Sequence, residues 1–146
     1  MRFLRWVPLV LILGALGCRS VQPVDVLGTW VITDASRSAL PAALQKASAT
    51  IVFDSDGNFR ASEMPAMFDV PGRQPERLES GRGTWKVPPG DSRQRIQLEF
   101  RQIAEWTWSE LPFGKELSVS SGWSSVELYY YVGAPDNGRR VVFEKR

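Results

Sequence analysis

The chain has 146 residues, with 18 lysines and arginines against 16 aspartates and glutamates, one cysteine and no histidine. Its length suits one domain with a hydrophobic core rather than two. The lack of histidine excludes catalytic sites that pair it with serine or cysteine, and it removes the commonest protein ligand of zinc.

The first 17 residues, MRFLRWVPLVLILGALG, are typical of a secretory signal peptide. Arg2 and Arg5 give a positively charged start, and the apolar run from Val7 to Leu13 is too short to span a bilayer comfortably. Removing these two arginines from the 18 basic residues leaves 16, equal to the 16 acidic residues. A neutral mature chain without a dense basic cluster argues against nucleic acid as a partner.

The cysteine stands directly after this peptide. Ala15-Leu16-Gly17-Cys18 resembles the lipobox of bacterial lipoproteins, in which the signal peptidase cuts before a cysteine that becomes acylated. The resemblance implies a lipid anchor on Cys18. Arg19, in place of an aspartate, implies the outer membrane of a Gram-negative bacterium, with the protein facing the periplasm. The alternative is an ordinary secretory peptide followed by a free thiol. We expect residues 18–26 to form an acylated tether and residues 27–146 to form the domain.

From Leu27 onward, apolar residues alternate with polar ones, which indicates antiparallel strands with one buried face. The expected inward-facing residues are Trp30, Ile32, Ile51, Phe53, Phe59, Ala61, Trp85, Val87, Ile96, Leu98, Phe100, Leu117, Val119, Val126, Leu128, Tyr130, Val132, Val141 and Phe143. Eight or nine such runs in one domain predict an all-β fold, an antiparallel up-and-down barrel of about eight strands, with a sandwich as the alternative.

Turn signals separate these runs. DSDGNF at 54–59 and APDNG at 134–138 predict hairpin turns, because glycine accepts the positive φ that tight turns require. A calcium loop at 54–58 is the alternative, but its glycine comes fourth, and an EF-hand loop needs it sixth. We expect no metal or cofactor.

Two segments depart from the alternation. SRSALPAALQKAS at 36–48 predicts a short helix after the first strand, with Ser38 as a cap and Pro41 near its first turn. Residues 62–83 contain several prolines and glycines and mixed charges without a clear period, so we expect a long loop there.

Gly-Thr-Trp occurs at 28–30 and again at 83–85, each time at the start of an alternating run. The first occurrence, with the strands that follow it, resembles the lipocalin-like (calycin) group and the small bacterial lipoproteins built on that fold. The resemblance implies that Gly28 and Trp30 close the narrow end of the barrel. It also implies a basic side chain over the indole, from Lys145, Arg146, Arg139 or Arg140. The alternative for Trp30 and Trp85 is plain core filling.

The remaining candidates for function are aromatic, apolar or acidic. Large inward-facing side chains leave room for a shallow pocket at the mouth, so we expect ligand contacts from Met64, Met67, Phe68, Trp85 and Tyr130. Trp106, Trp108 and Trp123, near Phe113 and Tyr129 to Tyr131, are candidates for a partner surface or for contact with the membrane interface next to the acyl anchor. Coverage of the barrel flank is the alternative. Glu105 and Glu110 are a candidate carboxylate pair for hydrolysis.

Three functions follow from these patterns. The first is a non-catalytic outer-membrane lipoprotein whose lipocalin-like barrel binds a small hydrophobic or amphipathic ligand. The second is a protein-binding or envelope-scaffolding module that uses the aromatic flank. The third is a carboxylate-based hydrolase, which requires two acids converging in a deep cleft.

Overall fold

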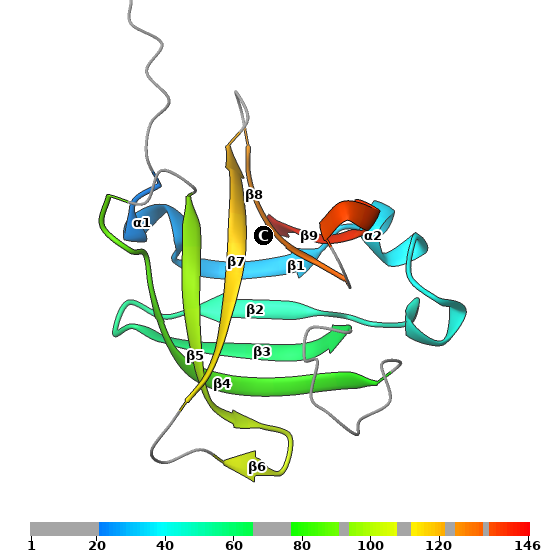
Figure 1. Cartoon of the computed structure of the whole chain (residues 1–146), viewed down its shortest axis with the longest axis horizontal. Helices are drawn as coiled ribbons and strands as arrows, with labels where there is room; N and C mark the ends of the chain where they lie inside the picture. Colours follow the sequence, from blue (N-terminus) through cyan, green and yellow to red (C-terminus); the bar gives the residue numbers. More distant parts are fainter. Residues whose placement is uncertain (1–20, 66–76, 91–93, 108–111, 122–124, 133–134) are drawn as a thin grey trace, which may run out of the picture.

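The computed structural model describes residues 21–65, 77–90, 94–107, 112–121, 125–132 and 135–146 (Figure 1). Antiparallel strands dominate this part of the chain. The strands are β1 (Gly28–Ile32), β2 (Thr50–Phe53), β3 (Asn58–Pro65), β4 (Leu78–Lys86), β5 (Arg95–Ile103), β6 (Trp106–Thr107), β7 (Phe113–Ser121), β8 (Val126–Tyr131) and β9 (Arg140–Lys145). The short helical segments are α1 (Pro23–Val26), α2 (Asp34–Ser38), η1 (Ala42–Leu44) and η2 (Pro135–Asn137).

Eight of the strands close into a barrel. Each pairs antiparallel with the next along the chain, from β1 to β5 and from β7 to β9, with β5 joined to β7. The ring closes where β9 pairs with β1, with Lys145 opposite Trp30. The short β6 pairs with the end of β5 and lies outside the ring. The prediction of an all-β up-and-down barrel of about eight strands is therefore confirmed, and the fold is a closed barrel rather than a sandwich.

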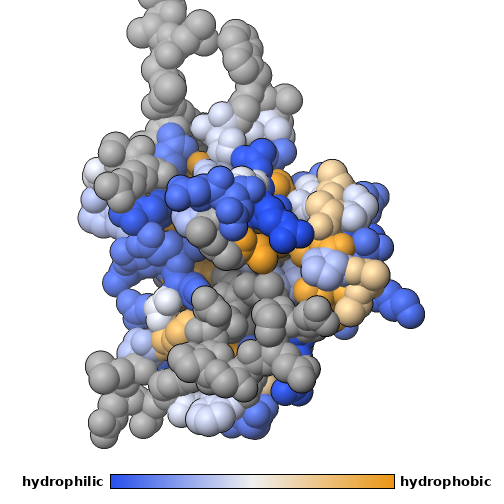
Figure 2. Space-filling view, turned by 45° about the vertical axis from the view of Figure 1, so that its right-hand side comes forward, coloured by the Kyte–Doolittle hydropathy of each residue, from blue (hydrophilic) through white to orange (hydrophobic). Residues whose placement is uncertain are grey.

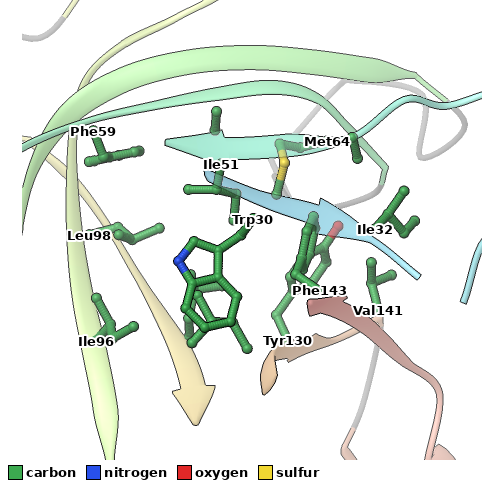
Figure 3. Close-up of a cluster of buried hydrophobic side chains, with 14 of the residues drawn as sticks. Trp30, Ile32, Ile51, Phe59, Met64, Ile96, Leu98, Tyr130, Val141 and Phe143 are labelled. Atoms are coloured by element: carbon green, nitrogen blue, oxygen red, sulfur yellow. The ribbon is translucent and has the colours of Figure 1, made fainter. Parts of the chain in front are cut away.

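The predicted alternation also holds. In β5, Ile96, Leu98 and Phe100 are buried, whereas the intervening residues face outward and are at least partly exposed. The other residues expected to face inward join the same core, with Trp85, Val87, Val126 and Val132 only partly buried. Figure 3 shows how side chains from several strands converge on the barrel axis around Trp30. Burying one face of every strand is what fixes the register of such a sheet.

The two ends of the barrel carry different segments. The chain enters β1 through α1 at the end where β1 begins, which we call the α1 end. It leaves β1 through α2 and η1 at the other end, the α2 end (Figure 1). Because the strands are antiparallel, β8 ends and β9 begins at the α2 end as well.

The segment after the first strand differs in detail from the prediction. The predicted helix at 36–48 is divided into α2, which ends at Ser38, and one 3-10 turn after Pro41. Thr33, not Ser38, caps α2: its side chain accepts a hydrogen bond from the backbone amide of Ser36. Pro41 lies at the start of the 3-10 turn, where its carbonyl accepts from the amide of Leu44, and α2 stops before it because proline disfavours helical geometry in the preceding residue.

The predicted long loop at 62–83 is too long at both ends. Residues up to Pro65 belong to β3, and residues from Leu78 belong to β4. The alternation fails there because the register shifts between Ala61 and Met64, where Glu63 has a φ of 50°. A second shift lies between Arg82 and Gly83 in β4. Such bulges break the period of two without ending the strand.

The folded unit begins before residue 27. Residues 23–26, expected to be part of a tether, form α1, and Val26 is completely buried in the core. Val21 is buried too. The chain thus joins the barrel within three residues of Cys18.

Candidate functional site

Trp30 seals the α1 end. Its indole is fully buried, and Nε1 donates a hydrogen bond of 2.8 Å to the carbonyl oxygen of Val26 in α1. Lys145 Nζ lies 5.7 Å from the centre of the Trp30 ring and donates to the carbonyl of Asp25 at 3.1 Å. Of the four basic residues that the sequence left open, Lys145 is therefore the one that packs on Trp30.

The second Gly-Thr-Trp lies at the same end of the barrel, but it does not start a strand. Trp85 is near the end of β4, which runs antiparallel to β3, and its backbone amide donates to the carbonyl of Gly57 in the β2–β3 turn. Its ring packs edge-on against Phe53, with 5.2 Å between centroids. Both tryptophans thus fill the α1 end, and Trp85 is remote from the mouth where a ligand contact was expected.

Met64 and Tyr130 belong to the packed core. Both side chains lie in the cluster that Figure 3 shows, and Met64 is completely buried. The Tyr130 hydroxyl donates a hydrogen bond to the carbonyl oxygen of Pro65. Burial raises the pKa of Tyr130, because a phenolate in this apolar environment would lose its hydration. Both side chains hold the α2 end together. Met67 and Phe68, the other expected contacts, lie outside the described residues.

Aromatic rings fill much of the barrel interior. Phe59 and Phe100 meet edge to face, with 4.8 Å between centroids, and Phe100 also packs beside Phe113. Gly81 lies under the Phe100 ring, and a Cβ there would approach the ring to 2.7 Å. The part of the interior that the structure describes is therefore packed with side chains around these rings.

A cavity of about 480 Å³ lies beside the core at the α2 end. It separates α2 and η1 from the ends of β8 and β9, and its volume falls within the roughly 300–1,000 Å³ typical of small-molecule sites. Most of its wall is apolar. The lining residues are Ser36, Ala39, Leu40, Pro41, Leu44, Val132, Gly138, Arg139, Arg140 and Val141.

Hydrogen bonds from backbone and side-chain groups hold α2 against β9 and so shape this cavity. The amide of Thr33 donates to the carbonyl of Val142, and the amide of Val142 donates to Ser36 Oγ at 2.9 Å. Gln45 Nε2 donates to the carbonyl of Leu40 at 2.9 Å, which fixes the turn into η1. In Figure 2, where this side of the molecule comes forward, apolar surface is visible between hydrophilic groups.

Two arginines lie at the rim of the cavity. Arg140 faces the outside of the barrel, where its guanidinium lies 5.2 Å from the centre of the Tyr129 ring. Arg139 precedes β9; it is exposed and lines the cavity, and its carbonyl accepts a hydrogen bond from the amide of Val132. Within the described part of the chain, Arg139 makes neither an ion pair nor a side-chain hydrogen bond. No residue among the cavity's described lining is acidic.

Sequence reasoning missed this cavity. The sequence predicts a helix at 36–48, in which Leu40 and Leu44 stand four residues apart, and it makes Arg139 a candidate to cover Trp30. The signal that was available is the apolar spacing of these leucines in a segment that connects two strands. A connecting segment with apolar residues of its own has to bury them against another part of the fold. Here the α2–η1 segment between β1 and β2 packs beside the β8–β9 hairpin.

The structure describes only part of the aromatic flank, the candidate partner surface formed by Trp106, Trp108 and Trp123. Trp106 is 54% exposed, and its Nε1 donates to the carboxylate of the neighbouring Glu105 at 3.1 Å. Tyr129 and Tyr131 face outward from β8 and meet edge to face at 5.6 Å. Trp108, Glu110 and Trp123 lie outside the described residues.

A second hollow, of about 460 Å³, lies on the barrel wall between β5 and β7. Its two carboxylates are engaged in ion pairs: Glu99 with Lys86 at 3.1 Å and Glu116 with Arg95 at 2.7 Å. Because these charges are already balanced, the hollow offers little to a ligand. The cavity at the α2 end is the better candidate for binding.

Nothing in the described ranges gathers three or more residues suited to a metal ion. The same ranges contain no helix that is long and apolar enough to cross a membrane. No protein-family model matches the chain, and no curated protein and no solved structure is significantly similar to it.

Proposed function

We propose that this protein is a non-catalytic, lipocalin-like lipoprotein that binds a small hydrophobic or amphipathic molecule in the cavity between α2–η1 and the β8–β9 hairpin. The observation that carries the proposal is the cavity itself. A void of about 480 Å³ with a mainly apolar wall favours an apolar occupant over water. The packed rings around Phe100 favour this position over the centre of the barrel.

The proposal includes acylation of Cys18 and residence at the outer membrane, on the periplasmic side. Only Arg19 and Ser20 separate Cys18 from Val21, and three extended residues span at most about 11 Å. An acyl anchor would therefore hold the α1 end close to the bilayer. The cavity, at the α2 end, would open on the far side.

Acylation is tested by growing cells with labelled palmitate. We expect the label in the wild-type protein and none in Cys18→Ser, which lacks the only cysteine. Membrane fractionation of the same cells should release Cys18→Ser into the soluble fraction. Equal labelling of both forms, or none in either, would overturn the lipoprotein part of the proposal.

Ligand binding is tested on a soluble form that begins at Arg19. This form keeps every described contact, because the described core starts at Val21. The probe is the fluorescent fatty acid cis-parinaric acid, followed by its own emission. Two variants make a matched pair: Ala39→Trp fills the cavity, whereas Ala43→Trp adds the same side chain at an exposed position that does not line it.

We expect Ala39→Trp to lose the probe and Ala43→Trp to bind it like the wild type. Binding that is the same in all three forms would contradict the cavity as the site. No binding to any form would contradict the ligand-binding proposal.

The second candidate function is a protein-binding or envelope-scaffolding module. Trp106 favours it, because this side chain is 54% exposed and tryptophan is among the residues enriched in binding hot spots. A photo-crosslinker at Thr107 in intact cells should then capture one dominant protein, and Trp106→Ala should remove that product. A diffuse set of products that Trp106→Ala leaves unchanged would contradict this function.

A further inference from the structure

Resting on the binding function proposed above, we infer that the cavity at the α2 end selects single-chain amphiphiles with an anionic head group, which Arg139 recognises at the rim. The apolar chain would lie along Leu40, Leu44 and Val141, and the head group would face solvent between α2 and the β8–β9 hairpin. The relevant chemistry is that of a carboxylate, sulfate or phosphate carried on an alkyl chain.

The apolar part of the argument comes from the cavity wall. Leu44 and Val141 are almost completely buried, and Leu40 is 8% exposed, so the inner wall offers no polar side chain except Ser36. Ser36 Oγ already accepts the hydrogen bond from the amide of Val142. A polar head group placed at this depth would lose its hydration and gain at most the one remaining O–H donor of Ser36, which disfavours that orientation.

The charge comes from the rim. Arg139 and Arg140 both line the cavity, and no acidic side chain is among its described lining residues. The nearby Arg37 is neutralised by Asp34, whose Oδ1 lies 3.0 Å from Arg37 Nη1. Asp136 is exposed on η2 and does not line the cavity. The rim is therefore positively charged.

The two arginines are not equivalent. Arg140 packs on Tyr129 at the outer face, where the ring already holds its cation. Arg139 has no such contact within the described chain, and it lines the same cavity as Val141. A guanidinium in this position can bind a carboxylate or phosphate through two parallel hydrogen bonds.

The test compares three ligands with one chain length: decanoate, decanol and decyltrimethylammonium. Binding to the soluble form from Arg19 is measured by calorimetry at low salt, with each ligand below its micellar concentration. We expect decanoate to bind about tenfold more tightly than decanol, as one charge-assisted pair allows, and the cation to bind most weakly. The advantage of decanoate should shrink at high salt, because exposed charges are screened.

Variants of the arginines show which residue causes the preference for decanoate over decanol. Arg139→Gln should bring decanoate down to the affinity of decanol and leave decanol unchanged, whereas Arg139→Lys should keep part of the preference. The matched control is Arg82→Gln, which removes the same charge from an exposed position on β4, on the opposite side of the ring from β9. It should change neither affinity.

The outcomes separate this inference from the function on which it rests. Equal affinities for decanoate and decanol, both abolished by Ala39→Trp, would overturn the head-group inference and keep the cavity. A decanoate preference that Arg139→Gln leaves intact would overturn the role of Arg139. If Arg82→Gln also lost the decanoate preference, that preference would be an effect of net charge, and the role of Arg139 would be overturned. Binding that ignores Ala39→Trp would overturn the cavity itself.

Discussion

The backbone amide of Val142 donates a hydrogen bond of 2.9 Å to the Oγ of Ser36, which lies 106 residues earlier in the chain. This contact replaces the strand pairing of β9 beyond the end of β1. β9 pairs with β1 as far as Ile32, and beyond that point α2 satisfies the free edge of β9 through Thr33 and Ser36. One side-chain hydroxyl thus continues the barrel wall and positions one side of the candidate cavity.

Ser36→Ala should therefore destabilise the protein and loosen α2. The substitution leaves the Val142 amide without its acceptor in a part-buried setting, and an unsatisfied donor costs about 1–3 kcal/mol when buried. The measurement is the free energy of unfolding in urea, together with hydrogen exchange at Val142. Ser38→Ala is the control, because Ser38 is exposed and its hydroxyl bonds only within α2. Equal losses in both variants would contradict this role of Ser36.

Glycines in β4 test the close packing of the barrel wall. A Cβ at Gly83 would lie 2.0 Å from the carbonyl oxygen of Glu99, a backbone atom that cannot move aside easily. We expect Gly83→Ala to destabilise the protein by about 1–3 kcal/mol, the usual range for overpacking. Gly114→Ala is the matched control in β7, since nothing lies within 4 Å of a Cβ there. Alanine there should be neutral or stabilise the strand by up to about 1 kcal/mol.

If thermal unfolding gives the two alanine variants the same stability, Gly83 does not lie as close to the backbone of Glu99 as the register shift between Arg82 and Gly83 places it. A loss confined to Gly83→Ala would support that register directly.

Lys145 and Trp30 test the sealed end. Lys145→Met keeps much of the aliphatic side chain but removes both the cation over the indole and the hydrogen bond to Asp25. We expect a loss of about 0.5–2 kcal/mol, the range of cation–π contacts from exposed to desolvated settings. Lys86→Met is the comparison, because Lys86 makes an exposed ion pair with Glu99, and such pairs contribute about 0–1 kcal/mol. The difference should persist at high salt, which screens the Lys86 pair first.

A larger loss of stability in Lys86→Met than in Lys145→Met would mean that Lys145 does not help to close the α1 end. Tryptophan emission gives a second measurement, because removing the cation over the Trp30 ring should change the environment of this indole.

The fold was predictable because the alternation is long and regular. Ile96, Leu98 and Phe100 in β5 were expected to face inward, and they do. The prediction failed where one residue interrupts the period of two, as at Glu63 in β3 and at the shift before Gly83. A bulge changes which residues face inward without leaving a composition signal of its own, so the strands around 62–83 were mistaken for a loop.

The site was less predictable than the fold. The expected ligand residues were chosen as large apolar groups, and the described ones, Met64, Trp85 and Tyr130, are used in packing. The cavity instead depends on how α2 and η1 settle on the β8–β9 hairpin, with Leu40 and Val141 more than 100 positions apart in the chain. Periodicity describes each element, but it does not describe how a connection packs on a distant hairpin.

Tyr130 makes the stability depend on alkaline pH. Burial raises the pKa of its hydroxyl above the ordinary 10.0, so the folded protein keeps a proton that the unfolded chain releases more readily. The stabilisation is complete below the unfolded pKa and is lost as pH rises above it, by up to about 1.4 kcal/mol per pH unit. We expect the free energy of unfolding in urea to fall above about pH 10 in the wild type.

Tyr130→Phe isolates this term. At neutral pH the variant should be less stable by about 1–3 kcal/mol, because the buried carbonyl of Pro65 loses its donor. Above about pH 10 the gap should narrow, since phenylalanine has no proton to lose. Tyr131→Phe is the control: this side chain is 40% exposed on the outer face, and the variant should follow the wild-type curve. A gap between wild type and Tyr130→Phe that stays constant up to pH 11 would contradict a buried hydroxyl at the α2 end, because a hydroxyl with access to water would titrate alike in both states.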